Sequence, residues 1–412
     1  MIGRVDLVQG RRRLVLGPPD AELRASVTIN SPRRFWRSLA GGFSVGLGES
    51  YAEGHWDCDD LVALVRIFAP EMARLDRPRA LMAPLVRATS RAPRNTRAAS
   101  RRNIAAHYDL GNELFSLFLD ESMTYSAAVF DPPHIDLHAA QREKLDRACR
   151  KLQLNEDDHL LEIGTGWGSM ALHAAGRYGC RVTTTTLSRE QHAYATQRVR
   201  ENGLDDRVEV LLDDYRELNG SYSKLVSVEM IEAVGWQYLD EYFRVCSRLL
   251  EDDGAMLLQA IVFADDLAFE AEKSACSFAN TLVFPGGCLP SVEAIGRSLA
   301  AATDMRQLGL EDITADYART LRAWRSRFRA RAADGEALGY DERFRRLWDF
   351  YLAWSEGGFA QRRILDVQML LAKPGYPASR LNIPAEMRSS RNAGPREASL
   401  ASASRPPGPS TL

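Results

Sequence analysis

The sequence lacks several features that mark secreted, membrane-spanning or metal-binding proteins. It has no run of about 18 apolar residues and no apolar signal segment near Met1, so we expect neither a membrane span nor export by that route. Its six cysteines are scattered and form no C-x-x-C pair, which favours reduced thiols in the cytoplasm over disulfides or a zinc site. We therefore expect no metal, and any membrane contact should be peripheral.

An excess of one charge is also missing. The chain has 53 Lys and Arg residues against 55 Asp and Glu residues, so it has no overall field that would recruit nucleic acid. A nucleic-acid partner is therefore not expected.

The most informative segment that is present is a glycine-rich loop behind a short apolar run. Residues 161–168 read Leu-Glu-Ile-Gly-Thr-Gly-Trp-Gly. Glycines let the backbone approach a ligand where a β-carbon would clash. The spacing differs from the dinucleotide pattern G-x-G-x-x-G, whose third glycine comes one residue later. The loop favours S-adenosylmethionine (AdoMet), while another nucleotide or a plain tight turn stays open.

The length of 412 residues predicts one large and one small domain. We expect a small mixed N-terminal domain over 1–86 and a basic linker over 87–102, which has six Arg and no acid. The linker fits a solvated connector and equally a segment resting on anionic lipid headgroups. A methyltransferase-type domain should follow over 103–377, and the Ser-, Pro- and Ala-rich tail 378–412 is expected to be disordered.

Alternating strands and helices after residue 103 predict a parallel sheet with crossover helices. Ligands bind at the carboxyl ends of such strands, where the glycine loop, Thr186 and Glu232 all fall. A helical lid is expected over 264–366. Its aromatic stripe fits a buried core face and also a cover over an apolar channel. The expected strands are 159–163, 181–186, 208–212, 224–229, 255–263 and 367–372, with helices at about 139–152, 169–177, 189–202 and 238–250.

Six further motifs are specific in combination. They are His107–Asn112 (HYDLGN), Met123–Ser126 (MTYS), Ala140–Leu145 (AQREKL), Leu187–Gln191 (LSREQ), Glu229–Glu232 (EMIE) and Phe284–Ser291 (FPGGCLPS). Together they resemble the cyclopropane-fatty-acid synthase family of AdoMet-dependent methyltransferases over about 45–375. The resemblance implies a Rossmann-like class I AdoMet methyltransferase α/β sheet with a helical lid insertion and a small N-terminal domain. His107 also fits a structural hydrogen-bonding role.

The resemblance also implies a set of AdoMet-binding residues. Glu162 should orient the loop or the methionine ammonium. The second strand ends in threonines without an acid for the ribose, so Thr186 and Gln191 should supply neutral hydrogen bonds instead. The full expected set is Tyr125, Ser126, Glu162, Gly164, Thr165, Gly166, Thr186, Leu187, Gln191, Tyr215 and Arg216.

The family is thought to use a bound bicarbonate as a base after methyl transfer. The matching positions here are Ala127, Glu232, Gln259, Ile261 and Tyr317, so the Cys and His of the family pattern are missing. Gln259 could still bind bicarbonate in another geometry, or the cation could be resolved by loss of another proton. Because no His follows His192, the sequence leaves Glu232 and Tyr317 to manage a proton or a cation, unless Glu232 is a buried structural acid. We assign Glu232, Tyr317 and Gln259 as candidate catalytic residues, and bicarbonate stays open.

The resemblance implies methyl transfer from AdoMet to a cis double bond of an unsaturated phospholipid acyl chain, at the cytoplasmic face of the membrane. The product is a cyclopropane or, as the departures at Ala127 and Gln259 slightly favour, a methyl-branched or methylene-bearing chain. A non-catalytic AdoMet- and lipid-binding protein is the alternative of another class. Methylation of an N or O nucleophile would need a polar acceptor pocket. The sequence leaves open whether the chain forms a homodimer.

Overall fold

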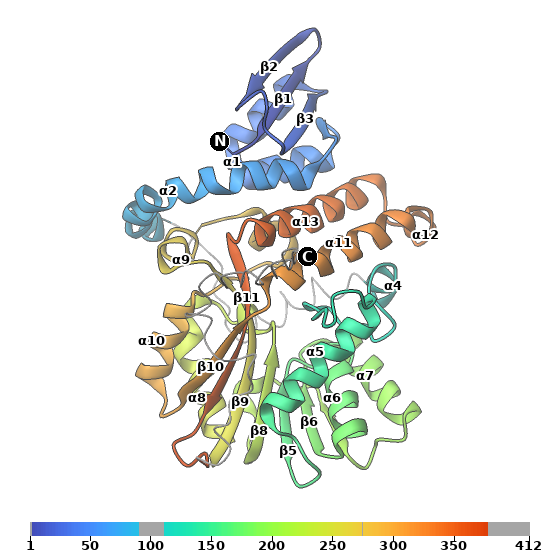
Figure 1. The fold of residues 1–412 in the computed structure, drawn as a ribbon, viewed down its shortest axis with the longest axis vertical. Helices are drawn as coiled ribbons and strands as arrows, with labels where there is room; N and C mark the ends of the chain where they lie inside the picture. The colour runs from blue at the N-terminus through green and yellow to red at the C-terminus, as the bar shows by residue number, and fades with distance from the viewer. Residues whose placement is uncertain (1, 90–110, 274, 378–412) are drawn as a thin grey trace, which may run out of the picture.

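The computed structural model describes residues 2–89, 111–273 and 275–377. A small N-terminal unit sits above a large α/β unit, as Figure 1 shows. The predicted tail, His107 and most of the predicted linker lie outside the described residues.

The small unit is a four-stranded sheet with two helices. Its strand order is β2-β1-β3-β4, in which β1 pairs with β3 in parallel and the other pairs are antiparallel. Helix α2 leaves the sheet and extends to Thr89, past the start of the predicted linker. The elements are β1 (Arg4–Gln9), β2 (Arg12–Leu16), β3 (Arg24–Ile29), α1 (Pro32–Ala52), β4 (Trp56–Cys58) and α2 (Leu61–Thr89).

The large unit is built on a seven-stranded sheet of order β10-β11-β9-β8-β5-β6-β7. Strands β9, β8, β5, β6 and β7 run parallel, and β11 and β10 add antiparallel strands at one edge. This is the predicted Rossmann-like sheet. The strands are β5 (His159–Ile163), β6 (Arg181–Thr185), β7 (Val208–Leu211), β8 (Tyr222–Val228), β9 (Leu250–Phe263), β10 (Arg306–Asp312) and β11 (Ile364–Ala372).

Helices cover both faces of this sheet. Parallel strands that are buried on both faces read as continuous apolar runs, as in the fully buried stretch Ala255–Leu258 of β9. Short polar side chains cap the helices: Asp136 accepts from the amide of Ala139, and Ser188 from the amide of Gln191. The elements on one face are α5 (Leu137–Leu152), α6 (Ser169–His173), the π-helix η1 (Ala174–Tyr178) and α7 (Arg189–Glu201); α8 (Leu239–Leu249) and α10 (Val292–Ala302) pack on the other.

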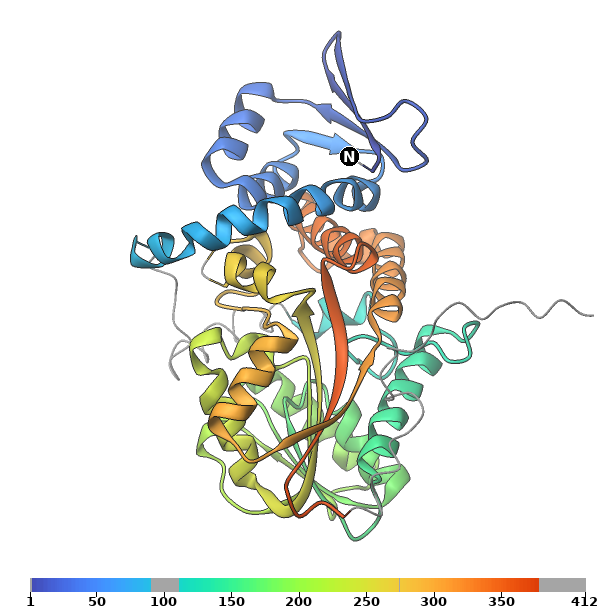
Figure 2. The ribbon, with the colours of Figure 1, turned by 60° about the vertical axis from the view of Figure 1, so that its left-hand side comes forward.

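The segment expected to be a helical lid is mostly helical but also contributes β10, which sequence analysis missed. Helices α11 and α13 pack against each other and lie between the small unit and the sheet, as Figures 1 and 2 both show. The aromatic stripe of α11 is buried, which confirms its interpretation as a core face. The remaining helices are α4 (Asn112–Ser116), α9 (Asp266–Glu272), α11 (Thr314–Ala330), α12 (Ala332–Ala337) and α13 (Glu342–Ala360), with short turns η2 (Tyr215–Glu217), η3 (Ile231–Ala233), η4 (Trp236–Tyr238) and η5 (Ala279–Val283).

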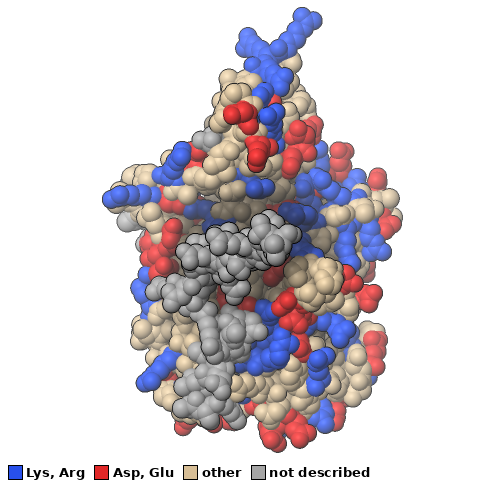
Figure 3. Space-filling view, viewed as in Figure 1, with Lys and Arg blue, Asp and Glu red and all other residues tan. Residues whose placement is uncertain are grey.

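The small unit and the lid helices share one hydrophobic core. Arg346 of α13 donates to the carbonyls of Tyr51 and Trp56 at 2.7 and 2.9 Å, and Arg363 pairs with the buried Asp76 of α2. Figure 3 shows basic side chains at the tip of the small sheet and both charge signs interspersed elsewhere on the drawn face. The contacts fix the lid helices between the small unit and the sheet.

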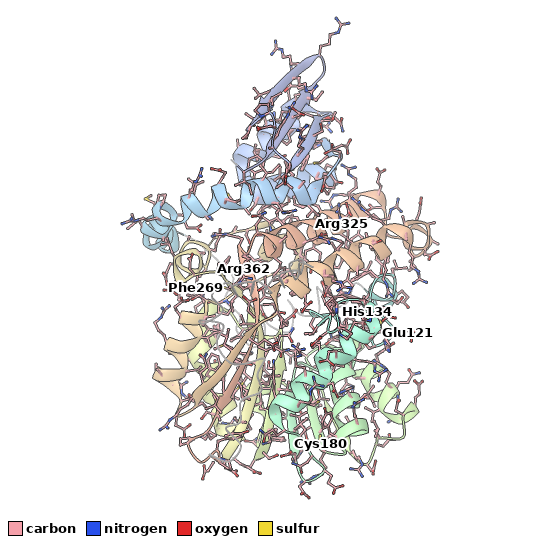
Figure 4. All side chains as sticks on the ribbon, viewed as in Figure 1. Glu121, His134, Cys180, Phe269, Arg325 and Arg362 are labelled. Atoms are coloured by element: carbon pink, nitrogen blue, oxygen red, sulfur yellow. The ribbon has the colours of Figure 1, made fainter. Side chains whose placement is uncertain are left out.

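The strand order places the site. The chain runs outward from β5 through β6 and β7 on one side, and through β8 and β9 on the other, so a crevice forms at the carboxyl ends of β5 and β8. Figure 4 labels Cys180, which precedes β6, at the lower edge of the sheet, and Arg325 and Arg362 beyond its upper edge. The carboxyl ends of the parallel strands therefore face α11 and α13.

Candidate active site

The glycine loop follows β5 and depends on backbone conformations that favour glycine. Gly164, Gly166 and Gly168 have φ values of +104°, +52° and +87°. The amides of Gly164 and Thr165 each donate to the carbonyl of Thr185 at 3.1 Å, which ties the loop to β6. A β-carbon added to Gly166 would meet no atom within 4 Å. The loop therefore leaves open space beside its backbone, as a bound nucleoside requires.

Glu162, the acid at the end of β5, is buried behind this loop. Its Oε2 accepts from Thr184 Oγ1 at 2.6 Å, and the same hydroxyl lies 2.7 Å from Thr165 Oγ1. Burial raises the pKa of Glu162 to about 8, although the hydrogen bond from Thr184 and the charge of Lys144 oppose the shift. A cationic ligand group would favour its ionised form.

The loop opens into a cavity at the carboxyl ends of β5, β6 and β8. All the residues expected to bind AdoMet line it, and the structure thus brings together segments spread over more than ninety positions. They are Tyr125, Ser126, Glu162, Gly164, Thr165, Gly166, Thr186, Leu187, Gln191, Tyr215 and Arg216.

Two pairs shape the far side of this cavity. Thr186 donates to Gln191 Oε1 at 2.8 Å, so the two expected neutral partners for a ribose form one hydrogen-bonded unit. Arg216 donates two hydrogen bonds to the buried Asp214, at 2.8 and 2.6 Å, and this pairing offsets its charge. This part of the wall is therefore polar, with the charge of Arg216 offset by Asp214.

An aromatic wall stands at another side of the cavity: Tyr125 lines the cavity, and the rings of Trp324 and Phe115 pack behind it. The ring of Tyr125 lies 5.3 Å from that of Trp324 and 5.2 Å from that of Phe115. The hydroxyl of Tyr125 lies 2.9 Å from that of Tyr351, and this hydrogen bond helps to fix the orientation of the ring. Trp324 and Phe115 are fully buried. Electron-rich faces of this kind attract a cation and exclude water.

Glu229 follows β8 directly and places a carboxyl group in the lining of the cavity. Its Oε1 accepts from the amide of Ala127 and from Gln259 Nε2, both at 2.8 Å. Its Oε2 accepts from the hydroxyl of Tyr317 at 2.7 Å. Two of the candidate catalytic residues, Gln259 and Tyr317, therefore converge on a residue to which sequence analysis gave no role.

The third candidate, Glu232, lies close by but does not line the cavity. Its Oε1 accepts from the amide of Ile261 at 2.5 Å. Burial, and then the charge of Glu229, raise the pKa of Glu232 to about 8. The buried Asp366 of β11, 3.1 Å from Gln259 Nε2, has a pKa well above its ordinary value for the same two reasons. Three carboxyl groups therefore crowd one buried region, which favours a single negative charge.

Comparison with known proteins decides the family. The family described as mycolic acid cyclopropane synthetase matches residues 95–369, well over half of the chain. The chain belongs to the mycolic acid cyclopropane synthetase family. The resemblance that the sequence motifs indicated is thus confirmed, and the chain is an AdoMet-dependent methyltransferase of this family.

Two curated relatives align with this chain over most of its length and over most of their own. Tuberculostearic acid methyltransferase UfaA1 of Mycobacterium tuberculosis is 39% identical over 364 residues, which cover 85% of this chain and 84% of the relative. Cyclopropane-fatty-acyl-phospholipid synthase of Escherichia coli is 37% identical over 354 residues, which cover 85% of this chain and 88% of the relative.

Solved structures of the synthetase family share the fold. The cyclopropane synthase MmaA2 from Mycobacterium tuberculosis is 28% identical with a TM-score of 0.62, and covers 66% of this chain and 98% of its own. The mycolic acid cyclopropane synthase CmaA1, determined with SAH and CTAB, is 30% identical with the same TM-score, covering 66% of this chain and 98% of its own. These structures confirm the predicted class of α/β fold.

Glu229, Lys144 and Asp366 lie at this site, although the sequence motifs gave them no role. Glu229 and Lys144 lie inside motifs that carried the resemblance. Lys144 is fully buried, lines the cavity and donates to Ser126 Oγ at 2.8 Å; burial lowers its pKa to about 8. In the sequence alone, Lys144 looks like an ordinary surface lysine of an amphipathic helix. A second acid three residues before Glu232 was the one available signal for Glu229.

Proposed function

We propose that the protein transfers the methyl group of AdoMet to a cis double bond in an unsaturated acyl chain of a phospholipid. Family membership supports methyl transfer. The names of the two curated relatives, one a cyclopropane-fatty-acyl-phospholipid synthase and the other a tuberculostearic acid methyltransferase, support a lipid substrate. No helix among the described residues is long and apolar enough to cross a membrane. In our proposal the acyl chain is reached by peripheral contact at the cytoplasmic face.

The observation that carries the proposal is the aromatic wall against the cofactor cavity. Methylation of an N or O nucleophile needs polar groups that orient the acceptor, whereas an alkene needs a dry site and stabilisation of the cation that forms. Tyr125 lines the cavity with an electron-rich ring, and the buried ring of Trp324, 5.3 Å away, backs it with apolar surface. The wall is therefore suited to an alkene.

The fit to AdoMet follows from the open space at Gly166 and from the donors around it. When bound, AdoMet supplies a methyl cation equivalent. In our proposal Glu162 holds its cationic end, the backbone of Gly164 to Gly166 lies along the nucleoside, and Thr186 with Gln191 binds the ribose. The chain's own contribution is to orient the cofactor and to keep water from the cation.

The product depends on how the cation is resolved. The positions at which the family pattern has Cys and His are Ala127 and Gln259 here, which favours an open-chain product that keeps an alkene, either methyl-branched or methylene-bearing. Ring closure to a cyclopropane is the second candidate, because the Escherichia coli relative named as a synthase is 37% identical.

The test is incubation of the full chain with AdoMet and vesicles of a phospholipid that carries cis-monounsaturated chains. We expect release of S-adenosylhomocysteine and a gain of one CH2 in the acyl chain, with derivatisation showing a remaining alkene. Vesicles of the saturated analogue are the matched control. Binding of AdoMet and lipid without S-adenosylhomocysteine release would contradict the proposal and indicate a non-catalytic protein.

A further inference from the structure

Glu229 has a backbone conformation that is unusual for a residue with a β-carbon. Its φ of +49° lies in the left-handed region, and its amide is held there by a 2.9 Å hydrogen bond to the carbonyl of Gln259. Such conformations cost conformational energy outside glycine, and they persist where the surroundings fix them, often at functional sites. The position holds an acid where glycine would fit with less strain.

Three donors orient the carboxylate of Glu229. Ala127, Gln259 and Tyr317 donate to it at 2.7–2.8 Å. The orientation of the Gln259 amide is fixed independently, because its Oε1 accepts from Gln368 Nε2 at 2.9 Å. Its Nε2 must therefore face Glu229. Hydrogen bonds of this kind favour the ionised carboxylate.

Of the three neighbouring carboxyl groups, those of Glu229, Glu232 and Asp366, the surroundings favour ionisation of Glu229. Glu232 and Asp366 face it, and both have raised pKa values because they are buried beside its charge. Burial raises the pKa of Glu229 as well, but its three donors and the nearby cation of Lys144 oppose that shift. Tyr317, the remaining titratable group in contact, has a pKa well above its ordinary value and stays protonated.

Glu229 is also the one carboxyl of these three that lines the cavity. It does so together with Tyr125 of the aromatic wall and Gly164 of the loop. A β-carbon added to Gly164 would lie 3.3 Å from Met230, the next residue, so this segment abuts the loop directly. A group transferred from the cofactor to an alkene at the wall would lie within this same cavity.

We propose that Glu229 is the general base of the reaction, an inference that rests on the proposed function. The alkene π electrons form a C–C bond to the methyl carbon, the C–S bond breaks with its electron pair left on sulfur, and the neighbouring carbon becomes cationic. The Glu229 carboxylate then takes one proton, and the released C–H pair closes a ring or forms an alkene. Gln259 and Tyr317 act as positioning residues for this carboxylate.

The donors around Glu229 also leave no set of free partners for a bound bicarbonate. Of the five positions that the family resemblance links to bicarbonate, Ala127, Gln259 and Tyr317 donate to Glu229, and Glu232 and Ile261 hydrogen-bond each other. The residues present therefore do not fit a bound bicarbonate, because their donors are already used within the chain. The carboxylate of Glu229 occupies the point on which these donors converge, where a small anion would otherwise have to bind.

The test compares the wild-type chain with Glu229→Gln and Glu229→Gly, and uses Glu209→Gln on the exposed face of β7 as the matched control. Turnover on vesicles of cis-monounsaturated phospholipid is measured in CO2-free buffer, with and without added bicarbonate or acetate. AdoMet affinity is measured by calorimetry. Binding of ¹³C-labelled bicarbonate is followed by NMR, and melting temperatures report folding.

We expect bicarbonate to leave wild-type turnover unchanged. Glu229→Gln should lose about 100-fold or more in turnover, the typical contribution of a general base, with AdoMet affinity unchanged. Glu229→Gly should lose as much but recover part of the rate with bicarbonate or acetate, and it alone should bind labelled bicarbonate. Gly suits a φ of +49°, so this variant also tests the assignment if Glu229→Gln folds poorly.

Three results would overturn the assignment: near wild-type turnover in Glu229→Gln, a wild-type chain that binds or requires bicarbonate, or no rescue of Glu229→Gly by either anion. The NMR comparison needs no turnover. It therefore still tests Glu229 if the wild-type chain methylates none of the lipids, a result that would overturn only the proposed function.

Discussion

The hydroxyl of Tyr317 donates a 2.7 Å hydrogen bond to the carboxylate of Glu229, 88 positions earlier in the chain. Tyr317 belongs to helix α11, in the segment expected to be a lid, and Glu229 follows the central strand β8. The helical segment therefore completes the site as well as covering the sheet. A change in the packing of α11 should alter the chemistry of the carboxylate.

Tyr317→Phe tests this link. The variant keeps the stacking of the ring on Phe359, 4.3 Å away, but loses the donor that lowers the pKa of Glu229. Loss of a hydrogen bond to a charged carboxylate, worth about 1.5 kcal/mol, should move the acid limb of the kcat profile upward by about one pH unit. Turnover below that limb should fall roughly tenfold, with AdoMet affinity unchanged.

The control for this variant is Tyr178→Phe. That hydroxyl also donates to a carboxylate, Asp146 Oδ1 at 2.9 Å, but away from the cavity. Its pH profile should match that of the wild-type chain. An unmoved acid limb in Tyr317→Phe would separate Glu229 from the titration that limits turnover.

Gly166→Val should abolish AdoMet binding. Its side chain would project into the open space beside the loop, and the φ of +52° disfavours any β-branched residue. Gly10→Val is the matched control, since Gly10 has a φ of +58° and an equally open surrounding in the hairpin of the small sheet. Calorimetry should show normal AdoMet affinity in the control alone; retained affinity in Gly166→Val would remove the loop from the cofactor site.

Glu232→Gln should make thermal stability less sensitive to pH. The folded pKa of Glu232, about 8, lies above its ordinary value of 4.5, so the folded state holds a proton that the unfolded chain gives up. Its contribution to stability is full below pH 4.5 and is lost as the pH rises towards 8. The neutral Gln avoids that loss of stability. At pH 8 the variant should therefore melt a few degrees higher than the wild-type chain, at about 2 °C per kcal/mol. At pH 4.5 the two proteins should melt at the same temperature. A difference that does not change with pH would place the Glu232 pKa near its ordinary value.

Much of the sheet could be predicted because its strands are buried on both faces and interrupted by capped helices. All six predicted strands are present, and Asp136 and Ser188 cap two of the predicted helices. Strand β10 was missed because Arg306–Asp312 has only two large apolar residues and lies at the edge of the sheet. Edge strands carry a weak pattern, since one side of their backbone pairs with nothing in the sheet.

The lining of the cavity proposed to hold the cofactor could be predicted from local motifs, but the acid on which Gln259 and Tyr317 converge could not. Glycine spacing and the ends of strands are local properties, and the expected residues all line one cavity. The role of Glu229 depends on Gln259 and Tyr317, which reach it from another strand and from a helix of the lid segment. Such convergence depends on tertiary packing, and the spacing of motifs along the sequence carries no information about that packing.

The most direct test of the account uses AdoMet with a fully deuterated methyl group and a phospholipid with cis-monounsaturated chains, followed by mass spectrometry of the acyl chains. We predict methyl transfer to the double bond followed by loss of one proton or deuteron. If the transferred methyl group loses a deuteron, the acyl chain gains CD2. If the acyl chain loses one of its own hydrogens instead, it gains CD3 and loses one H. Derivatisation then separates a ring from an alkene. Unchanged acyl chains, or label confined to the headgroup, would contradict methyl transfer to the alkene.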